Sequence, residues 1–216
     1  MNAPWTSPVG SFSLVVTPPT EEPLTLADGK LRAGLDWADT DPPDPRDALM
    51  RDFIAAARVQ VERDTGLALL TQTRDVYFSL VSGGLVALPG QALPLQEVIE
   101  VWPVDEWPGL PGAEVPVRSG PARAARDARL VTQGGVTHLA TSALDGLTAA
   151  VARCVVGWKN RETLKAEQPL LVHAVGLLTA HFATTGRDPV ISGTIAQMNP
   201  IGYDDAIASY RLVWVI

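Results

Sequence analysis

The stretch DPRDALMRDFIAAARVQVERDTG, residues 44–66, decides the fold of a large part of this chain. Asp44 before Pro45 is the usual beginning of a helix, and Gly66 is the residue type that commonly ends one. Between them the apolar residues recur at steps of three and four, which places them on one face of a helix over about residues 45–65. These residues are Leu49, Phe53, Ile54, Ala56, Ala57 and Val61.

Three further segments are expected to be helical. Thr25 can cap a short helix over about residues 25–35, in which an early aspartate favours the N-terminal dipole. A wide apolar stripe begins at Pro169 and predicts a helix over about residues 169–185. A last short helix is expected over about residues 204–212.

Residues 70–160 have a different pattern, with short β-branched or aromatic runs between glycines and prolines. This pattern predicts an antiparallel β unit. The order helix–helix–β–helix–helix, without an internal repeat, predicts an α+β fold: a small helical bundle of about four helices with an inserted antiparallel β unit. The expected strands are residues 73–80, 84–89, 97–102, 114–118, 128–132, 135–139 and 149–158.

The two ends of the chain differ from the body. Residues 1–22 are rich in proline and poor in charge, which predicts an extended N-terminal arm, and residues 23–216 are expected to form one domain. The first residues show no signal peptide. The uncharged run 76–96 contains prolines and glycines, so it is interpreted as strands and turns and not as a membrane span.

Composition excludes several function classes. The 216 residues carry a formal net charge of −7, which argues against a dedicated DNA-binding or anionic-membrane-binding protein. The single cysteine, Cys154, excludes an internal disulfide and a cysteine-based metal site, and its apolar surroundings predict a buried, inert thiol. We expect the protein in a reducing cytoplasm.

No motif indicates catalysis, a cofactor or a metal. The triplet Asp64-Thr65-Gly66 matches the loop of an aspartic protease, but it ends an amphipathic helix, where Gly66 is expected as the C-terminal cap. His173 and His181 are eight residues apart, and a helical zinc pair needs a spacing of four. With His138, they are expected to be packed or surface residues. We therefore expect no enzyme and no cofactor.

The basic stretch Arg118, Arg123, Arg126 and Arg129 allows two interpretations. It can be a loop that contacts phosphates, or a solvated connection between strands. No aromatic residue alternates with the arginines, as a single-strand binder would need, so the second interpretation is favoured.

The C-terminal tail is the segment that most needs a partner. It ends the chain with five apolar residues, and chain ends usually lie at the surface. The tail can pack on its own domain as an edge strand, or dock on another chain by strand addition. The candidate partner interface is Arg211, Leu212, Val213, Trp214, Val215 and Ile216.

Several segments, in this order, resemble the head–tail connector (adaptor) family of tailed bacteriophages. EPLTLADGKLR at 22–32 is similar to the family's first helix, and DALMRDFIAAARVQVERDTG at 47–66 to its most recognisable segment. LPLQEV at 93–98 matches a strand entry, LLTAHF at 177–182 the late helix, and PIGY at 200–203 with SYR at 209–211 the closing motif.

The resemblance covers nearly the whole chain from Glu22, with two departures. FATTGRD at 182–188 stands where the family usually has WYENRE, and the chain continues past Arg211. These departures concern local contacts more than the fold.

The resemblance implies a structural virion protein without catalysis. Such adaptors form a ring, typically of twelve copies, in the neck between head and tail, after assembly in the host cytoplasm. The ring contacts the portal protein above it and a stopper or tail component below it. Packaged DNA would pass through the lumen without specific binding, which suits an acidic wall, and no membrane is involved. The particle would be a phage or a phage-derived gene transfer agent.

Two alternatives stay open. One is a tail-completion protein or another small neck protein, which differs in its partner and ring symmetry. The other is a hydrolase that uses Asp64 of the Asp64-Thr65-Gly66 triplet in a dimer, and a helical Asp64 would exclude it.

Overall fold

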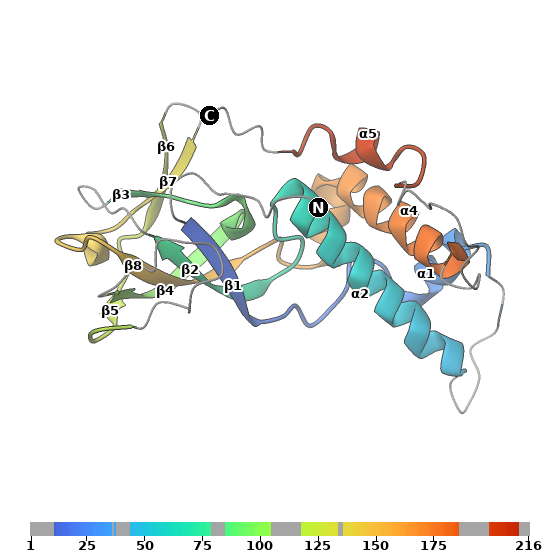
Figure 1. Cartoon of the computed structure of the whole chain (residues 1–216), viewed down its shortest axis with the longest axis horizontal. Coiled ribbons are helices and arrows are strands. Elements are labelled where there is room, and N and C mark those ends of the chain that lie inside the picture. The colour runs from blue at the N-terminus through green and yellow to red at the C-terminus, as the bar shows by residue number, and fades with distance from the viewer. Residues whose placement is uncertain are drawn as a thin grey trace, which may run out of the picture. The chain divides into compact units, whose positions relative to one another are not determined.

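The computed structural model describes residues 11–35, 37, 44–78, 85–104, 118–133, 136–185 and 199–211. They form helices and antiparallel sheets, so the predicted α+β fold class is confirmed (Figure 1). The chain divides into two compact units. The helical unit contains the described residues between 20 and 70 and between 158 and 211, and the sheet unit contains those between 11 and 19 and between 71 and 157.

The helical unit is arranged around one long helix, α4, which contacts the other four helices of the described unit. One of these four, α3, is not expected from the sequence; the Asn160 side chain caps it by accepting a hydrogen bond from the backbone N–H of Thr163 at 2.8 Å. The helices are α1 (Leu26–Arg32), α2 (Pro45–Thr65), α3 (Arg161–Glu167), α4 (Pro169–Thr185) and α5 (Tyr203–Ile207).

The limits of α2 follow from its two end residues. The backbone N–H of Arg46 donates to the Asp44 carboxylate at 2.8 Å, which satisfies one of the free donors of the first turn. At the other end Gly66 has a φ of 72°, in the left-handed region where glycine carries no steric penalty, and its N–H donates to the carbonyl of Glu62.

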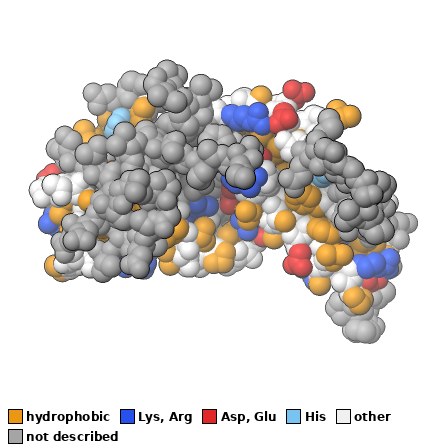
Figure 2. All heavy atoms as spheres, viewed as in Figure 1, with side chains coloured by type: hydrophobic (Ala, Val, Ile, Leu, Met, Phe, Trp, Pro, Cys, Tyr) orange, Lys and Arg blue, Asp and Glu red, His pale blue; other side chains and the backbone are white. Residues whose placement is uncertain are grey.

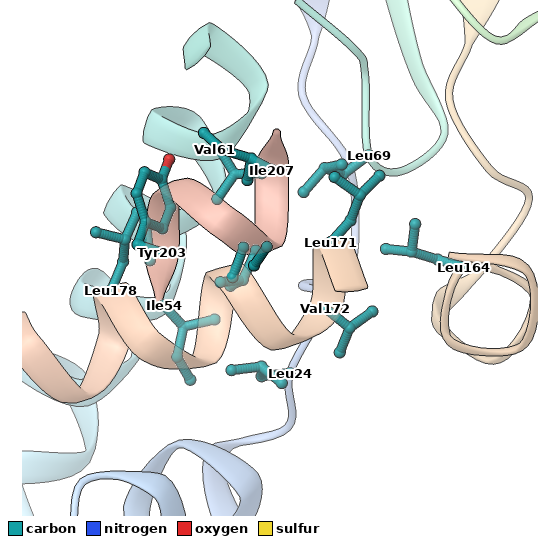
Figure 3. Packing of buried hydrophobic residues seen from close by; sticks show 14 of the residues in the cluster. Leu24, Ile54, Val61, Leu69, Leu164, Leu171, Val172, Leu178, Tyr203 and Ile207 are labelled. Carbon is teal, nitrogen blue, oxygen red and sulfur yellow. The ribbon is translucent and has the colours of Figure 1, made fainter. Parts of the chain in front are cut away.

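The helices enclose one hydrophobic core (Figure 3). Each large side chain that is fully removed from water contributes about 1.5–3 kcal/mol, so this cluster is the main force holding the helical unit together. Residues from all parts of the unit converge there: Leu24, Ile54, Val61, Leu69, Leu164, Leu171, Val172, Leu178, Tyr203 and Ile207.

Charged side chains tie the segment before α1 to α2. Arg58 donates to the Glu22 carboxylate at 2.8 Å and to the Glu62 carboxylate at 3.1 Å. Glu62 is buried and also accepts the backbone N–H of Leu69 at 2.9 Å. Each buried carboxylate and guanidinium of this group therefore has a hydrogen-bonded partner, as burial requires.

The sheet unit contains two antiparallel sheets. The five-stranded sheet has the order β1-β2-β8-β4-β5, and the three-stranded sheet has the order β3-β7-β6. The strands are β1 (Ser11–Thr17), β2 (Gln72–Phe78), β3 (Leu85–Ala87), β4 (Leu95–Pro103), β5 (Arg123–Ala124), β6 (Arg129–Gln133), β7 (Val136–Ala140) and β8 (Ala150–Val156), with 3-10 turns at Gly90–Ala92 and Ser142–Leu144.

The segment expected to be an N-terminal arm contributes a strand to the larger sheet. β1 pairs with β2 from Ser11 opposite Phe78 to Thr17 opposite Thr73, with an irregularity between Val15 and Thr17. Phe12 stacks on Tyr77 across this pair, with ring centroids 4.7 Å apart. Residues 11–17 of the arm therefore form an extended strand that belongs to the sheet.

One expected strand lies mostly outside the described residues. Of the strand expected at 114–118, residues 114–117 lie outside the described residues, and Arg118 forms an isolated bridge with Val104. None of the described helices is both long and apolar enough to span a membrane.

Candidate functional site

A buried carboxylate, Asp75, organises one region of the five-stranded sheet. It lies on β2, directly opposite Arg153 of β8 in the strand register. Arg153 donates to it with Nε at 2.8 Å and with Nη2 at 3.0 Å, and Nη2 of Arg118 donates to it at 2.5 Å. Two guanidinium groups therefore bind one buried carboxylate within the sheet unit.

Trp102 of β4 completes this group. The Arg118 guanidinium carbon lies 3.9 Å from the ring centroid of Trp102, and that of Arg153 lies 5.4 Å from it, so both cations contact the ring face. The hydrogen bonds to Asp75 raise the pKa of Arg153. Each charged side chain of this group is paired within the sheet unit, with one positive charge in excess, which indicates a structural ion-pair network.

Sequence reasoning missed this network. The one available signal is the adjacent charged pair Arg74 and Asp75 inside a predicted strand that continues with apolar residues. Nothing in the spacing identifies Arg118, Arg153 and Trp102 as the partners of Asp75, because they come from three other segments.

The basic stretch is engaged in part with its own chain. Arg118 binds Asp75, and Nη1 of Arg123 donates to the carbonyls of Ala143 and Asp145 at 3.3 and 2.9 Å. Arg126 and Arg129 are exposed. These contacts favour a structured connection between strands over a loop that contacts phosphates.

Asp127, within the same stretch, holds the turn that follows β7. Its carboxylate accepts the Thr141 hydroxyl at 2.6 Å and the backbone N–H of Ser142 at 2.7 Å. These hydrogen bonds lower the pKa of Asp127 to about 2. Both oxygens of the Asp127 carboxylate are therefore hydrogen-bonded to the turn that they stabilise.

The hydrolase alternative is wrong for Asp64. This residue lies in α2, where its carboxylate accepts the hydroxyl of Tyr203 at 2.8 Å and the side-chain amide of Gln60 at 2.7 Å. An aspartic protease presents its aspartate on a turn, whereas here the triplet is the end of a helix capped by Gly66. Burial, and then the bond to Asp64, raise the pKa of Tyr203 well above its usual value.

The remaining titratable candidates are structural. Nδ1 of His173 lies 3.4 Å from Nη1 of Arg32, His138 contacts the carbonyl of Val136, and the ring of His181 lies against that of Phe182. Among the described residues no group of three or more histidine, cysteine, aspartate or glutamate side chains could hold a metal ion. Cys154 is buried, and burial raises the pKa of its thiol to about 12.

The predicted partner interface is described only at its first residue. Arg211 is exposed and forms an ion pair with Asp204 of α5, which is also exposed. Such a surface pair contributes little to stability. Leu212, Val213, Trp214, Val215 and Ile216 lie outside the described residues.

An exposed apolar edge of the larger sheet is the second feature that sequence reasoning missed. Within the described residues β1 has one neighbouring strand, β2, and three consecutive apolar residues near its end are exposed: Leu14 by 39%, Val15 by 50% and Val16 by 44%. Exposed apolar side chains also reach the surface of the helical unit, between charged ones (Figure 2). An uncharged sheet edge of this kind is a site where another strand can pair.

The exposed β1 edge is thus a surface on which another polypeptide strand can pair. It belongs to an α+β scaffold of helices and antiparallel sheets. Among solved structures this scaffold recurs in chains of gene transfer agent (GTA) particles. No family model and no curated protein matches the sequence.

The chain is similar to a chain in "Neck of empty GTA particle computed with C6 symmetry", with 20% identity, a TM-score of 0.65 and coverage of 95% of this chain and 97% of that one. It is similar to chains in "Virion of native gene transfer agent (GTA) particle" (22% identity, TM-score 0.62, coverage 94% and 97%) and in "Neck of native GTA particle computed with C12 symmetry" (21%, 0.57, 95% and 97%). At this identity the similarity establishes a shared fold over nearly the full length of both chains.

Proposed function

We propose that this chain is a structural protein of the virion neck, a head–tail connector (adaptor) subunit of a phage-like particle such as a gene transfer agent. The observation that carries the proposal is the shared fold over 95% of this chain and 97% of a chain from a GTA neck. Agreement over the whole length, and not over one common unit, favours a shared role.

The internal charges are consistent with a structural role. Asp75, Glu62 and Asp47 are buried, and each is bound by a cation of the same unit. Perturbed groups of a catalytic site usually face a cleft, where substrate can reach them. Here the buried charges hold strands and helices together, so we propose an assembly function without catalysis.

A ring is the proposed assembly. The C6 and C12 symmetries of the similar GTA neck structures support a closed ring, and twelve copies are proposed for the particle. In such a ring each subunit uses two different surfaces to contact its two neighbours. The net charge of −7 would let packaged DNA pass through the lumen without binding.

The proposed partners are the portal protein on one side of the ring and a stopper or tail-terminator protein on the other. Arg211 and residues 212–216 are the proposed contact segment. Burial of five successive apolar residues away from water lowers the free energy of the complex. This segment can meet the portal or a neighbouring subunit.

Omission of the chain from the particles tests the function. Without it we expect DNA-filled heads and separate, complete tails, counted by negative-stain microscopy, and restoration of joined particles by the full-length chain. Normal yields of joined particles would contradict the proposal.

The same experiment tests the rival role. Loss of a tail-completion protein would leave heads that carry a complete neck, together with defective tails. Binding of the purified chain to isolated portal favours the adaptor role, and binding to isolated tails with no portal binding would favour the rival.

A further inference from the structure

The exposed end of β1 is apolar on both faces of the sheet. Successive side chains of a regular strand point to opposite faces, so Leu14 and Val15 lie on opposite faces, and Val16 is the extra residue at the irregularity between Val15 and Thr17. All three are exposed, and the strand from Ser11 to Thr17 contains no charged residue and no proline. Natural sheets protect an edge with charges, prolines, bulges or a covering segment. The described residues of β1 contain neither charge nor proline, and one irregularity, between Val15 and Thr17.

A strand that covers this edge should be apolar on both of its own faces. Outside the described residues the sequence has several segments long enough to try, but most contain proline, glycine or charge. Proline and charge oppose pairing with an apolar edge, and glycine weakens it. The segments with such residues are 1–10, 38–43, 79–84, 105–117 and 186–198; the remaining one, LVWVI at 212–216, has five apolar residues and none of these breakers.

We propose that residues 212–216 of one copy add as a strand to the β1 edge of the next copy in the ring. This inference rests on the proposed function, because it assigns the tail to the contact between ring subunits. The lengths agree: five residues in a strand span about 17 Å, and the exposed part of β1, from Leu14 to Thr17, spans about 14 Å.

The chemistry of the two strands is complementary on both faces. Leu212, Trp214 and Ile216 would lie on one face of the added strand, and Val213 and Val215 on the other. Cross-strand pairs between such side chains and Leu14, Val15 and Val16 stabilise a sheet beyond its backbone hydrogen bonds. The Arg211–Asp204 ion pair lies on the surface just before the tail begins.

The occupant is a second copy because a ring needs each subunit to contact its two neighbours through two different surfaces, and the tail and the β1 edge are two such surfaces. A contact of this type repeats from copy to copy and closes into a ring when the rotation permits. Pairing of the tail with β1 of its own chain would satisfy both surfaces within one copy and leave neither for a neighbour.

Cross-linking between differently tagged copies tests the proposal. One copy carries Val16→Cys and the other carries Val213→Cys or Val215→Cys, and the native Cys154 does not interfere because it is buried. Oxidation is carried out on purified particles and on the free full-length protein at raised concentration. We expect disulfide-linked pairs that carry both tags in at least one of these samples.

Two matched variants show whether the β1 edge is responsible. Val15 and Val59 are exposed by 50% and 54%, and Val59 lies on α2, in the helical unit. Val15→Lys places a charge on the proposed contact, and we expect it to lower the yield of linked pairs about tenfold. Val59→Lys should leave the yield unchanged, and Val59→Cys should not link to the tail cysteines.

Three results would overturn the proposal: links formed only within one chain, no links in either sample, or an equal loss of links in Val15→Lys and Val59→Lys. The proposed function is tested separately. Absence of links in both samples, with particles whose heads and tails are joined, refutes only this contact, whereas normal particles without the chain refute the neck role itself.

Discussion

Replacement of Asp75 by asparagine removes the anion of the sheet unit's ion-pair network and keeps the side chain's size. In the native protein the carboxylate is bound by Arg153 through two nitrogens and by Arg118 through one. The side-chain carbonyl oxygen of asparagine can still accept a hydrogen bond from a guanidinium group, but the side chain carries no negative charge. Two guanidinium groups would then share the face of Trp102 without an anion between them.

The magnitude follows from the exposure of the three side chains. Loss of one partner from a fully buried ion pair costs about 3–5 kcal/mol. The side chain of Asp75 is 9% exposed, but those of Arg118 and Arg153 keep 33% and 30% of their exposure, so water stabilises part of the unpaired charge. We therefore expect a loss of about 2 kcal/mol in the free energy of unfolding, and a Tm lower by about 4–8 °C for a chain of this length.

Urea unfolding followed by circular dichroism and by tryptophan fluorescence measures the effect. The midpoint should fall with an unchanged m-value, because the surface exposed on unfolding stays the same. Glu97→Gln is the control, since it removes a negative charge from an exposed position of the same sheet unit, on β4. A stability of Asp75→Asn within 0.5 kcal/mol of the native protein, or an equal loss in Glu97→Gln, would refute the reasoning.

Three further predictions concern single groups. Because hydrogen bonds hold the pKa of Asp127 at about 2, below its ordinary 3.8, its support of the turn at Thr141 and Ser142 should be complete above about pH 4 and disappear toward pH 2. The protection of the Ser142 amide against hydrogen exchange should fall over that range; protection that does not change, or that changes equally in Asp127→Asn, would contradict this. Cys154, whose thiol pKa burial raises to about 12, should not react with a thiol reagent at pH 8 until the protein is unfolded, and rapid labelling of the folded protein would show that the site is open. Tyr203→Phe removes the hydroxyl that donates to Asp64 at 2.8 Å and should lower the free energy of unfolding by about 1 kcal/mol; no loss in urea unfolding would show that this hydrogen bond is not stabilising.

Local sequence signals predicted most of the helices because their causes are local. Asp44, Pro45 and Gly66 act on the helix that they flank, and α2 extends from Pro45 to Thr65 between them. The short helix α3 was missed although Asn160 caps it, because seven residues carry too little periodicity to stand out beside a strand.

The candidate surfaces were harder to predict. The tail is conspicuous in the sequence because five apolar residues end the chain. The β1 edge is not, since exposure of Leu14, Val15 and Val16 depends on β1 being the last strand of its sheet among the described residues. Strand order is set by pairing between segments about sixty residues apart, which no local pattern encodes.

The sequence by itself therefore determined the α+β class, the ends of α2 and the apolar character of the tail, since propensity, capping and composition act over a few residues. Only the tertiary structure decided that Asp75, Arg118, Arg153 and Trp102 meet, and that the Asp64 carboxylate accepts a hydrogen bond from the Tyr203 hydroxyl. It also decided that β1 lies at a sheet edge among the described residues. Each of these depends on contacts between segments distant in the chain, whose partners are selected by the packing of the whole unit.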